Sequence, residues 1–130
     1  MNKYIADTQA LVRHIAGESQ VISPAIDKVL RDTDRGLNII IVPAVVAFEI
    51  AYLNEKGRIP ITINHLQRLL EDCSNYIEEP LSLEIIAAAF QIPDIPELHD
   101  RLIAGTATFI GAPILTNDPV IRESLHVQCV

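Results

Sequence analysis

Four acidic residues stand where their carboxylates could meet in space, although more than a hundred positions separate the first from the last. They are Asp7, Glu49, Asp100 and Asp118. Asp7 and Asp118 each follow a predicted strand, and Asp100 lies near the start of a predicted helix. In open α/β sheets the carboxyl ends of the parallel strands share one edge, where ligands bind. We therefore expect the four side chains to converge there.

Converging carboxylates raise one another's pKa values and destabilise a fold unless a cation lies between them. A hard divalent cation removes that penalty. The chain has no His or Cys at a ligand spacing beside these acids, so the donors are all oxygen atoms. Oxygen donors favour Mg²⁺ or Mn²⁺ over zinc.

Three of the acids also have an ordinary explanation as helix caps. Asp7-Thr8 stands at a strand-to-helix junction, where an Asp stabilises the helix by about 0.5–2 kcal/mol. Taken alone, Asp7 is better explained as a cap. Asn117-Asp118-Pro119 reads equally well as a turn with Pro at the first helical position. It is the joint placement of the acids that favours a site.

Glu49 is harder to explain as a structural residue. Its neighbours at helical spacing are apolar, so no Lys or Arg on the same helix can pair with it. A carboxylate on an apolar face must reach solvent, find a distant cation, or serve chemistry. The sequence leaves open whether Glu49 reaches the edge of the buried face or belongs to the site.

The elements that must position these acids alternate between strand and helix. The unbroken apolar run at 38–42 is typical of a strand buried on both faces by helices. Other strands are predicted at 3–6, 76–77, 114–116 and 126–130. Helices are predicted at 9–16, 23–36, 44–56, 61–72, 82–91 and from near Asp100 to Ile110. This alternation predicts an α/β fold with a parallel sheet.

Length and composition predict a single domain over residues 1–130, without linkers or repeats. The longest apolar run, 39–48, is too short to cross a bilayer, and the first strand leaves no room for a secretory leader. We therefore expect a cytoplasmic protein that does not enter the membrane. Cys73 and Cys129 form no zinc motif and are expected to be reduced.

The net charge of −7 opposes general binding to nucleic acid, because a polyanion would be repelled. Binding through divalent cations escapes this limit, since the metal reverses the local field. Lys28, Arg31 and Arg35 form the densest basic group. A solvated helix face is the first interpretation of this group, and a patch that follows a phosphate backbone is the second. No glycine-rich phosphate loop is present.

Four blocks of the chain resemble the PIN domain, and in particular the VapC-type toxins of toxin–antitoxin pairs. The blocks are Asp7-Thr8, the segment 45–51 with 55–59 behind it, the segment 100–107, and 115–118. Together they span nearly the whole chain. The resemblance implies a small α/β/α sandwich around a parallel sheet.

The same resemblance implies metal-dependent hydrolysis of RNA. Asp7, Glu49, Asp100 and Asp118 would be catalytic, the three aspartates would bind Mg²⁺ or Mn²⁺, and Thr116 would support the site by hydrogen bonding. Glu97 would be a further supporting acid, at the spacing where many relatives carry one. An RNA substrate, a cognate antitoxin and a homodimer are the implied partners. The alternative is a PIN-like binding or dimerisation module without catalytic activity.

Overall fold

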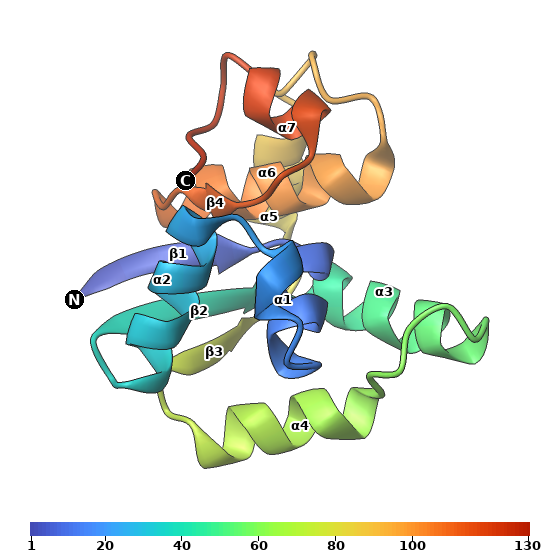
Figure 1. The fold of residues 1–130 in the computed structure, drawn as a ribbon. Helices are drawn as coiled ribbons and strands as arrows, with labels where there is room; N and C mark the ends of the chain where they lie inside the picture. The colour runs from blue at the N-terminus through green and yellow to red at the C-terminus, as the bar shows by residue number, and fades with distance from the viewer.

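The computed structural model describes residues 1–130 (Figure 1). Four parallel strands form one sheet in the order β3-β2-β1-β4. The strands are β1 (Asn2–Ala6), β2 (Asn38–Pro43), β3 (Tyr76–Glu79) and β4 (Ile114–Leu115). The helices are α1 (Thr8–Ile15), α2 (Pro24–Asp34), α3 (Ala44–Glu55), α4 (Ile63–Asp72), α5 (Leu83–Ala89), α6 (Leu98–Ile110) and α7 (Pro119–Glu123), with a 3-10 turn, η1 (Ser19–Val21).

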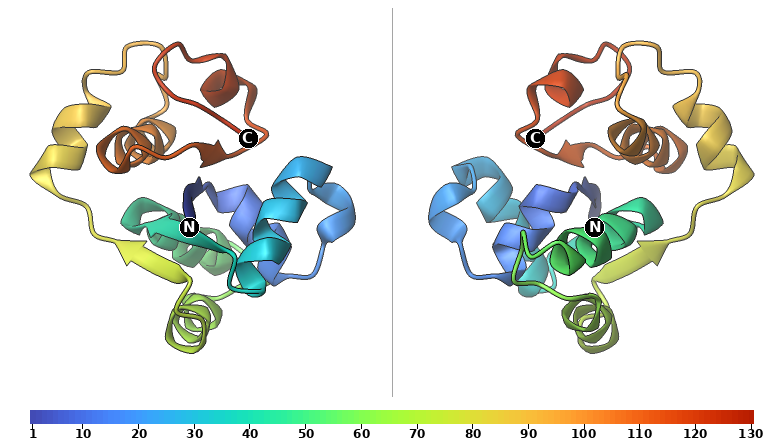
Figure 2. Two further views of the ribbon diagram at one scale, coloured as in Figure 1. Left: turned by 90° about the vertical axis from the view of Figure 1, so that its left-hand side faces the viewer. Right: turned by 90° about the vertical axis from the view of Figure 1, so that its right-hand side faces the viewer.

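Helices cover both faces of the sheet and make a three-layer α/β/α sandwich. Figure 2, which looks along the sheet, shows α1 and α2 on one side and α5 and α6 on the other. α4 packs beside the edge strand β3. α3 lies beyond the carboxyl end of β2, where it contacts both α1 and α6. This arrangement confirms the predicted fold class.

The sheet is held by its two central strands. β1 and β2 pair in parallel from Asn2↔Asn38 to Ile5↔Ile41. Ile5, Ile40 and Ile114 are fully buried, because helices cover both faces of these strands. β4 pairs with β1 over only two residues, Ile5↔Ile114 and Ala6↔Leu115. That short pairing is enough to bring the carboxyl end of β4 beside that of β1.

The segment 126–130 does not form the strand that the sequence predicts. It makes one isolated parallel bridge, between Ile114 and Cys129. β4 is only two residues long, so it offers a neighbouring segment too few backbone groups for a ladder. None of the helices has both the length and the apolar character needed to span a membrane.

Candidate active site

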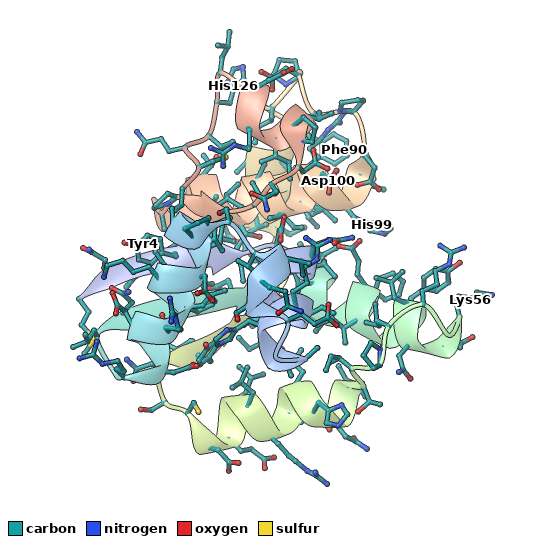
Figure 3. All side chains as sticks on the ribbon, viewed as in Figure 1. Tyr4, Lys56, Phe90, His99, Asp100 and His126 are labelled. Carbon is teal, nitrogen blue, oxygen red and sulfur yellow. The ribbon has the colours of Figure 1, made fainter.

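A cavity of about 370 Å³ opens at the carboxyl edge of the sheet. All four predicted acids line it, from four separate segments of the chain: Asp7, Glu49, Asp100 and Asp118. The helix starts of α1, α6 and α7 and one face of α3 meet at this point. Figure 3 shows Asp100 and His99 at the start of α6, on the side of the molecule from which α3 extends.

Asp7 is buried and caps α1. β1 ends at Ala6, and one carboxylate oxygen of Asp7 accepts a hydrogen bond from the Ala10 backbone N–H at 2.8 Å. Burial raises the pKa of Asp7, and the charge of Asp118 raises it further. Hydrogen bonds from Thr116 and Ala10 act in the opposite direction. The cap interpretation is therefore correct, yet it does not remove Asp7 from the cavity.

Glu49 reaches the same cavity from α3, and its partner is a hydroxyl group. Thr8 Oγ1 donates to Glu49 Oε1 at 2.8 Å. Burial raises the pKa of Glu49, while the bond to Thr8 and the nearby His99 lower it. Glu49 forms no ion pair with Lys or Arg. Of the two interpretations that the sequence leaves open, the structure favours a side chain directed at the site.

Asp100 is not the cap of its helix. The cap of α6 is Glu97, whose Oε2 accepts from the Asp100 backbone N–H at 2.7 Å. The Asp100 side chain is left free to face the cavity. Burial, together with the negative charges of Glu97, Asp118, Glu49 and Asp7, raises the pKa of Asp100 to about 7. Glu97 itself does not line the cavity.

Asp118 caps α7, and Thr116 holds its backbone in place. One Asp118 oxygen accepts from the backbone N–H groups of Val120 and Ile121, at 2.9 and 3.2 Å. Thr116 is fully buried, and its hydroxyl oxygen accepts from the Asp118 backbone N–H at 3.0 Å. The same hydroxyl contributes the hydrogen bond that lowers the pKa of Asp7. Thr116 thus links two of the acids through a single group.

The four carboxylates share one cavity but not one coordination sphere. No group of three or more His, Cys, Asp or Glu side chains is arranged to hold a metal ion as it stands. Like charges repel one another, and Asp7 and Asp118 each direct an oxygen at a helix N-terminus. The donor set nevertheless fits a hard cation, because four carboxylates line one cavity and hard divalent cations prefer carboxylate oxygens.

Further polar residues of the cavity are absent from the sequence-based prediction of the site. Thr8, Gln9, Arg13 and Asn117 all line it. Gln9 and Arg13 are four positions apart on a helix that begins at the site, and that spacing places them on one face. The sequence therefore contained a signal for Arg13. The Thr8–Glu49 bond joins residues that no local pattern relates.

Comparison with protein-family models matches residues 4–124 to the PIN domain. Among solved structures, the chain is similar to VapBC2 from Rickettsia felis bound to a promoter DNA fragment, at 16% identity and a TM-score of 0.70, covering 98% of this chain and 97% of the other. It is also similar to DNA-bound VapBC from Salmonella typhimurium, at 18% identity and a TM-score of 0.68, covering 100% and 98%.

A toxin–antitoxin complex from Klebsiella pneumoniae is a more distant neighbour, at 14% identity and a TM-score of 0.59, with 88% of this chain and 86% of that chain covered. No match was found among curated proteins. The family match spans nearly the whole chain, and the fold is that of chains in VapBC complexes. The chain therefore belongs to the PIN domain family.

Proposed function

We propose that this protein, acting as one PIN domain over residues 1–130, is a metal-dependent endoribonuclease and the toxin of a toxin–antitoxin pair. The observation that carries the proposal is the convergence of Asp7, Glu49, Asp100 and Asp118 on one cavity in a chain of this family. The VapBC complexes and the toxin–antitoxin complex among the structural neighbours support an antitoxin as its partner. The proposed location is the cytoplasm.

In this proposal Asp7, Asp100 and Asp118 hold Mg²⁺ or Mn²⁺. Asp7 and Asp118 keep their capping bonds with one oxygen and offer the other to the ion. Asp100 has no capping role, so it turns inward most readily. When bound, a divalent cation supplies a water of lowered pKa and neutralises charge on the phosphodiester.

Glu49 and Thr116 have positioning roles in the proposed reaction. The Thr8 hydroxyl fixes one Glu49 oxygen, so the other can orient a water for in-line attack on phosphorus. Thr116 fixes the backbone of Asp118 through its hydroxyl oxygen and lowers the pKa of Asp7. Glu97 supports the start of α6 and adds negative charge beside Asp100. The expected products carry 5′-phosphate and 3′-hydroxyl ends, as the resemblance implies.

The proposal predicts that purified protein cleaves RNA only when Mg²⁺ or Mn²⁺ is present. Asp100→Asn should reduce cleavage by at least about 100-fold, the upper end for losing a group that merely supports a metal site. Glu71→Gln is the matched control, because Glu71 is exposed on α4. Gel analysis of defined single-stranded and structured RNAs provides the measurement.

Cleavage in the presence of chelator, or equal cleavage by wild type and Asp100→Asn, would contradict the metal-dependent mechanism. If wild type cleaves no RNA with either ion, the non-catalytic binding module becomes the better description.

A homodimer is also proposed, and exposed apolar side chains offer a candidate surface for it. Large apolar side chains are exposed on α3, where Phe48 stacks on Tyr52, and on α5 and α6. On α5, Leu83 is 82% exposed, and Phe90, at its C-terminal cap, is 58% exposed. Exposed apolar side chains that lie close together are typical of protein–protein contacts.

A further inference from the structure

A second cavity adjoins the acidic cavity beside α1 and the end of α3. Its volume is about 220 Å³. Thr8, Gln9 and Arg13 line both cavities, so the two lie next to each other along α1. Leu53 and Arg58 line the far side of the second cavity. We call this second cavity the arginine groove.

Arg13 stands at the junction of the two cavities. It is the only Lys or Arg among the residues that line the acidic cavity. One guanidinium N–H donates to the Val21 carbonyl oxygen at 3.1 Å, which fixes the group while leaving other donors free. Its charge acts on Asp7, whose pKa it lowers. Arg13 forms no ion pair with a carboxylate.

Arg58 is placed by the end of α3. Gly57 has a φ of 68°, a conformation that favours glycine, and it turns the chain back on the helix. The Arg58 backbone N–H then donates to the Leu53 carbonyl oxygen at 2.9 Å. The Asn54 side chain holds the following loop through the Ile59 carbonyl oxygen at 3.1 Å. The Arg58 side chain is exposed and likewise forms no ion pair.

The basic residues of α2 differ from these two arginines. Within α2, Lys28 pairs with Asp32 and Arg31 with Asp27, and Arg35, at the C-terminal cap of the helix, also pairs with Asp32. The densest basic group in the sequence is therefore largely neutralised, as a solvated helix face would be. By contrast, Arg13 and Arg58 form no ion pair, although Glu18 also lines the arginine groove.

We propose that the arginine groove binds the RNA strand on one side of the cleaved bond. Arg13 binds the phosphate next to the cleaved one, and Arg58 binds a phosphate farther along. The inference rests on the proposed nuclease function. A metal ion neutralises only the phosphate that it contacts, so flanking phosphates in a protein of net charge −7 need separate cations.

The test compares two substrates in the presence of Mn²⁺. Bis(p-nitrophenyl) phosphate has a single phosphodiester and fills only the acidic cavity, whereas a short single-stranded RNA also reaches the groove. Arg58→Ala should raise KM for RNA by about 1.5- to 5-fold, the range for an exposed charge pair, and leave hydrolysis of the small substrate unchanged. Arg13→Gln, which keeps a donor for Val21, should also raise KM for RNA. Because Arg13 lines the acidic cavity and acts on Asp7, only Arg58→Ala is compared on the small substrate. Arg68→Ala is the control, because Arg68 is exposed on α4 and lines neither cavity.

A binding measurement supplies a readout that does not depend on turnover. In an Asp100→Asn background, fluorescence anisotropy gives RNA affinity as a function of salt concentration. Each arginine substitution should reduce the slope of log affinity against log salt by about 0.7, the value for one phosphate contact on a single strand. Arg68→Ala should leave the slope unchanged.

Three results would overturn the inference. The first is RNA kinetics for Arg58→Ala and Arg13→Gln that match those of Arg68→Ala. The second is an equal loss by Arg58→Ala on both substrates with a lowered melting temperature, which would assign Arg58 a structural role. The third is a wild-type protein that cleaves no RNA with either ion, which removes the nuclease function as well. Only the first two leave the nuclease function standing.

Discussion

Burial and the repulsion among neighbouring acids set the properties of Asp100. Its pKa in the folded protein is about 7, above the ordinary value of 3.8. The protonated carboxyl group of Asp100 therefore stabilises the folded state in full below about pH 4. This contribution is lost as the pH rises through about 7. At neutral pH in the absence of metal, the ionised carboxylate lowers the free energy of unfolding. A bound cation would raise it again.

We accordingly predict that Asp100→Asn stabilises the metal-free protein at pH 8. The expected gain is on the order of 1 kcal/mol, discounted because the carboxyl group is half exposed. In a domain of this size that gain raises Tm by about 3–5 °C. Thermal melting at pH 8 and pH 5 provides the measurement, and the difference between variant and wild type should shrink at pH 5. Glu71→Gln is again the control. If Asp100→Asn leaves Tm at pH 8 unchanged or lowers it, the ionised Asp100 does not destabilise the metal-free protein.

At the residue scale, the sequence was enough to predict which acids could form a site. It was not enough to predict their hydrogen-bond partners. Asp7 and Asp118 could be placed because each follows a strand, and the carboxyl ends of parallel strands meet at one edge. The pairing of Glu49 with Thr8 depends on how α3 packs against α1. The cap of α6 also differs from expectation, because Glu97 rather than Asp100 accepts the bond at its N-terminus.

At the scale of elements, the placement of α6 depends on one glycine. A Cβ added at Gly105 would lie 2.7 Å from the Ala89 Cβ and 2.8 Å from both the Ala89 nitrogen and the Ile85 carbonyl oxygen. Two of these three atoms belong to the backbone of α5, so they cannot move aside as a flexible side chain would. α5 and α6 therefore pack with their backbones in close approach, and Asp100 lies five residues earlier on the same helix.

We predict that Gly105→Ala destabilises the protein by about 1–3 kcal/mol, the usual cost of overpacking a buried contact. It should also lower cleavage, because displacing α6 moves Asp100 relative to Asp7. Urea unfolding and RNA cleavage provide the two measurements. Adding Ala89→Gly should recover only part of the stability, since the backbone contacts at Ala89 and Ile85 remain. Full recovery would show that the side chain of Ala89 was the whole obstacle.

The strands and helices themselves were largely predictable, with bounds that differ from the structure by one or two residues at most ends. β2 was the clearest, because an unbroken β-branched run is hard to bury in any other way. The predicted strand at 126–130 was wrong because its pairing depends on the length of β4, a property of a neighbour rather than of the segment itself.

At the scale of the whole molecule, the proposed homodimer can be tested through α5. Leu83→Glu should weaken self-association, because it places a charge among exposed apolar side chains. Sedimentation velocity over a range of concentrations would show a shift toward monomer. Leu125→Glu is the matched control, since Leu125 is 92% exposed and lies outside the helices. A wild-type protein that sediments as a monomer at every concentration would contradict the dimer.

Asp7 and Asp118 each use one carboxylate oxygen to cap a helix, and this bears on how the protein folds. Each carboxylate already stabilises a helix start through backbone amides, and the apolar core lies among the sheet and its covering helices. We therefore expect the chain to fold without the ion that the proposal assigns to the site, unlike small zinc domains whose metal supplies the energy of folding. Removing the cation should therefore abolish cleavage while leaving the fold intact. Adding the cation back should restore cleavage without refolding.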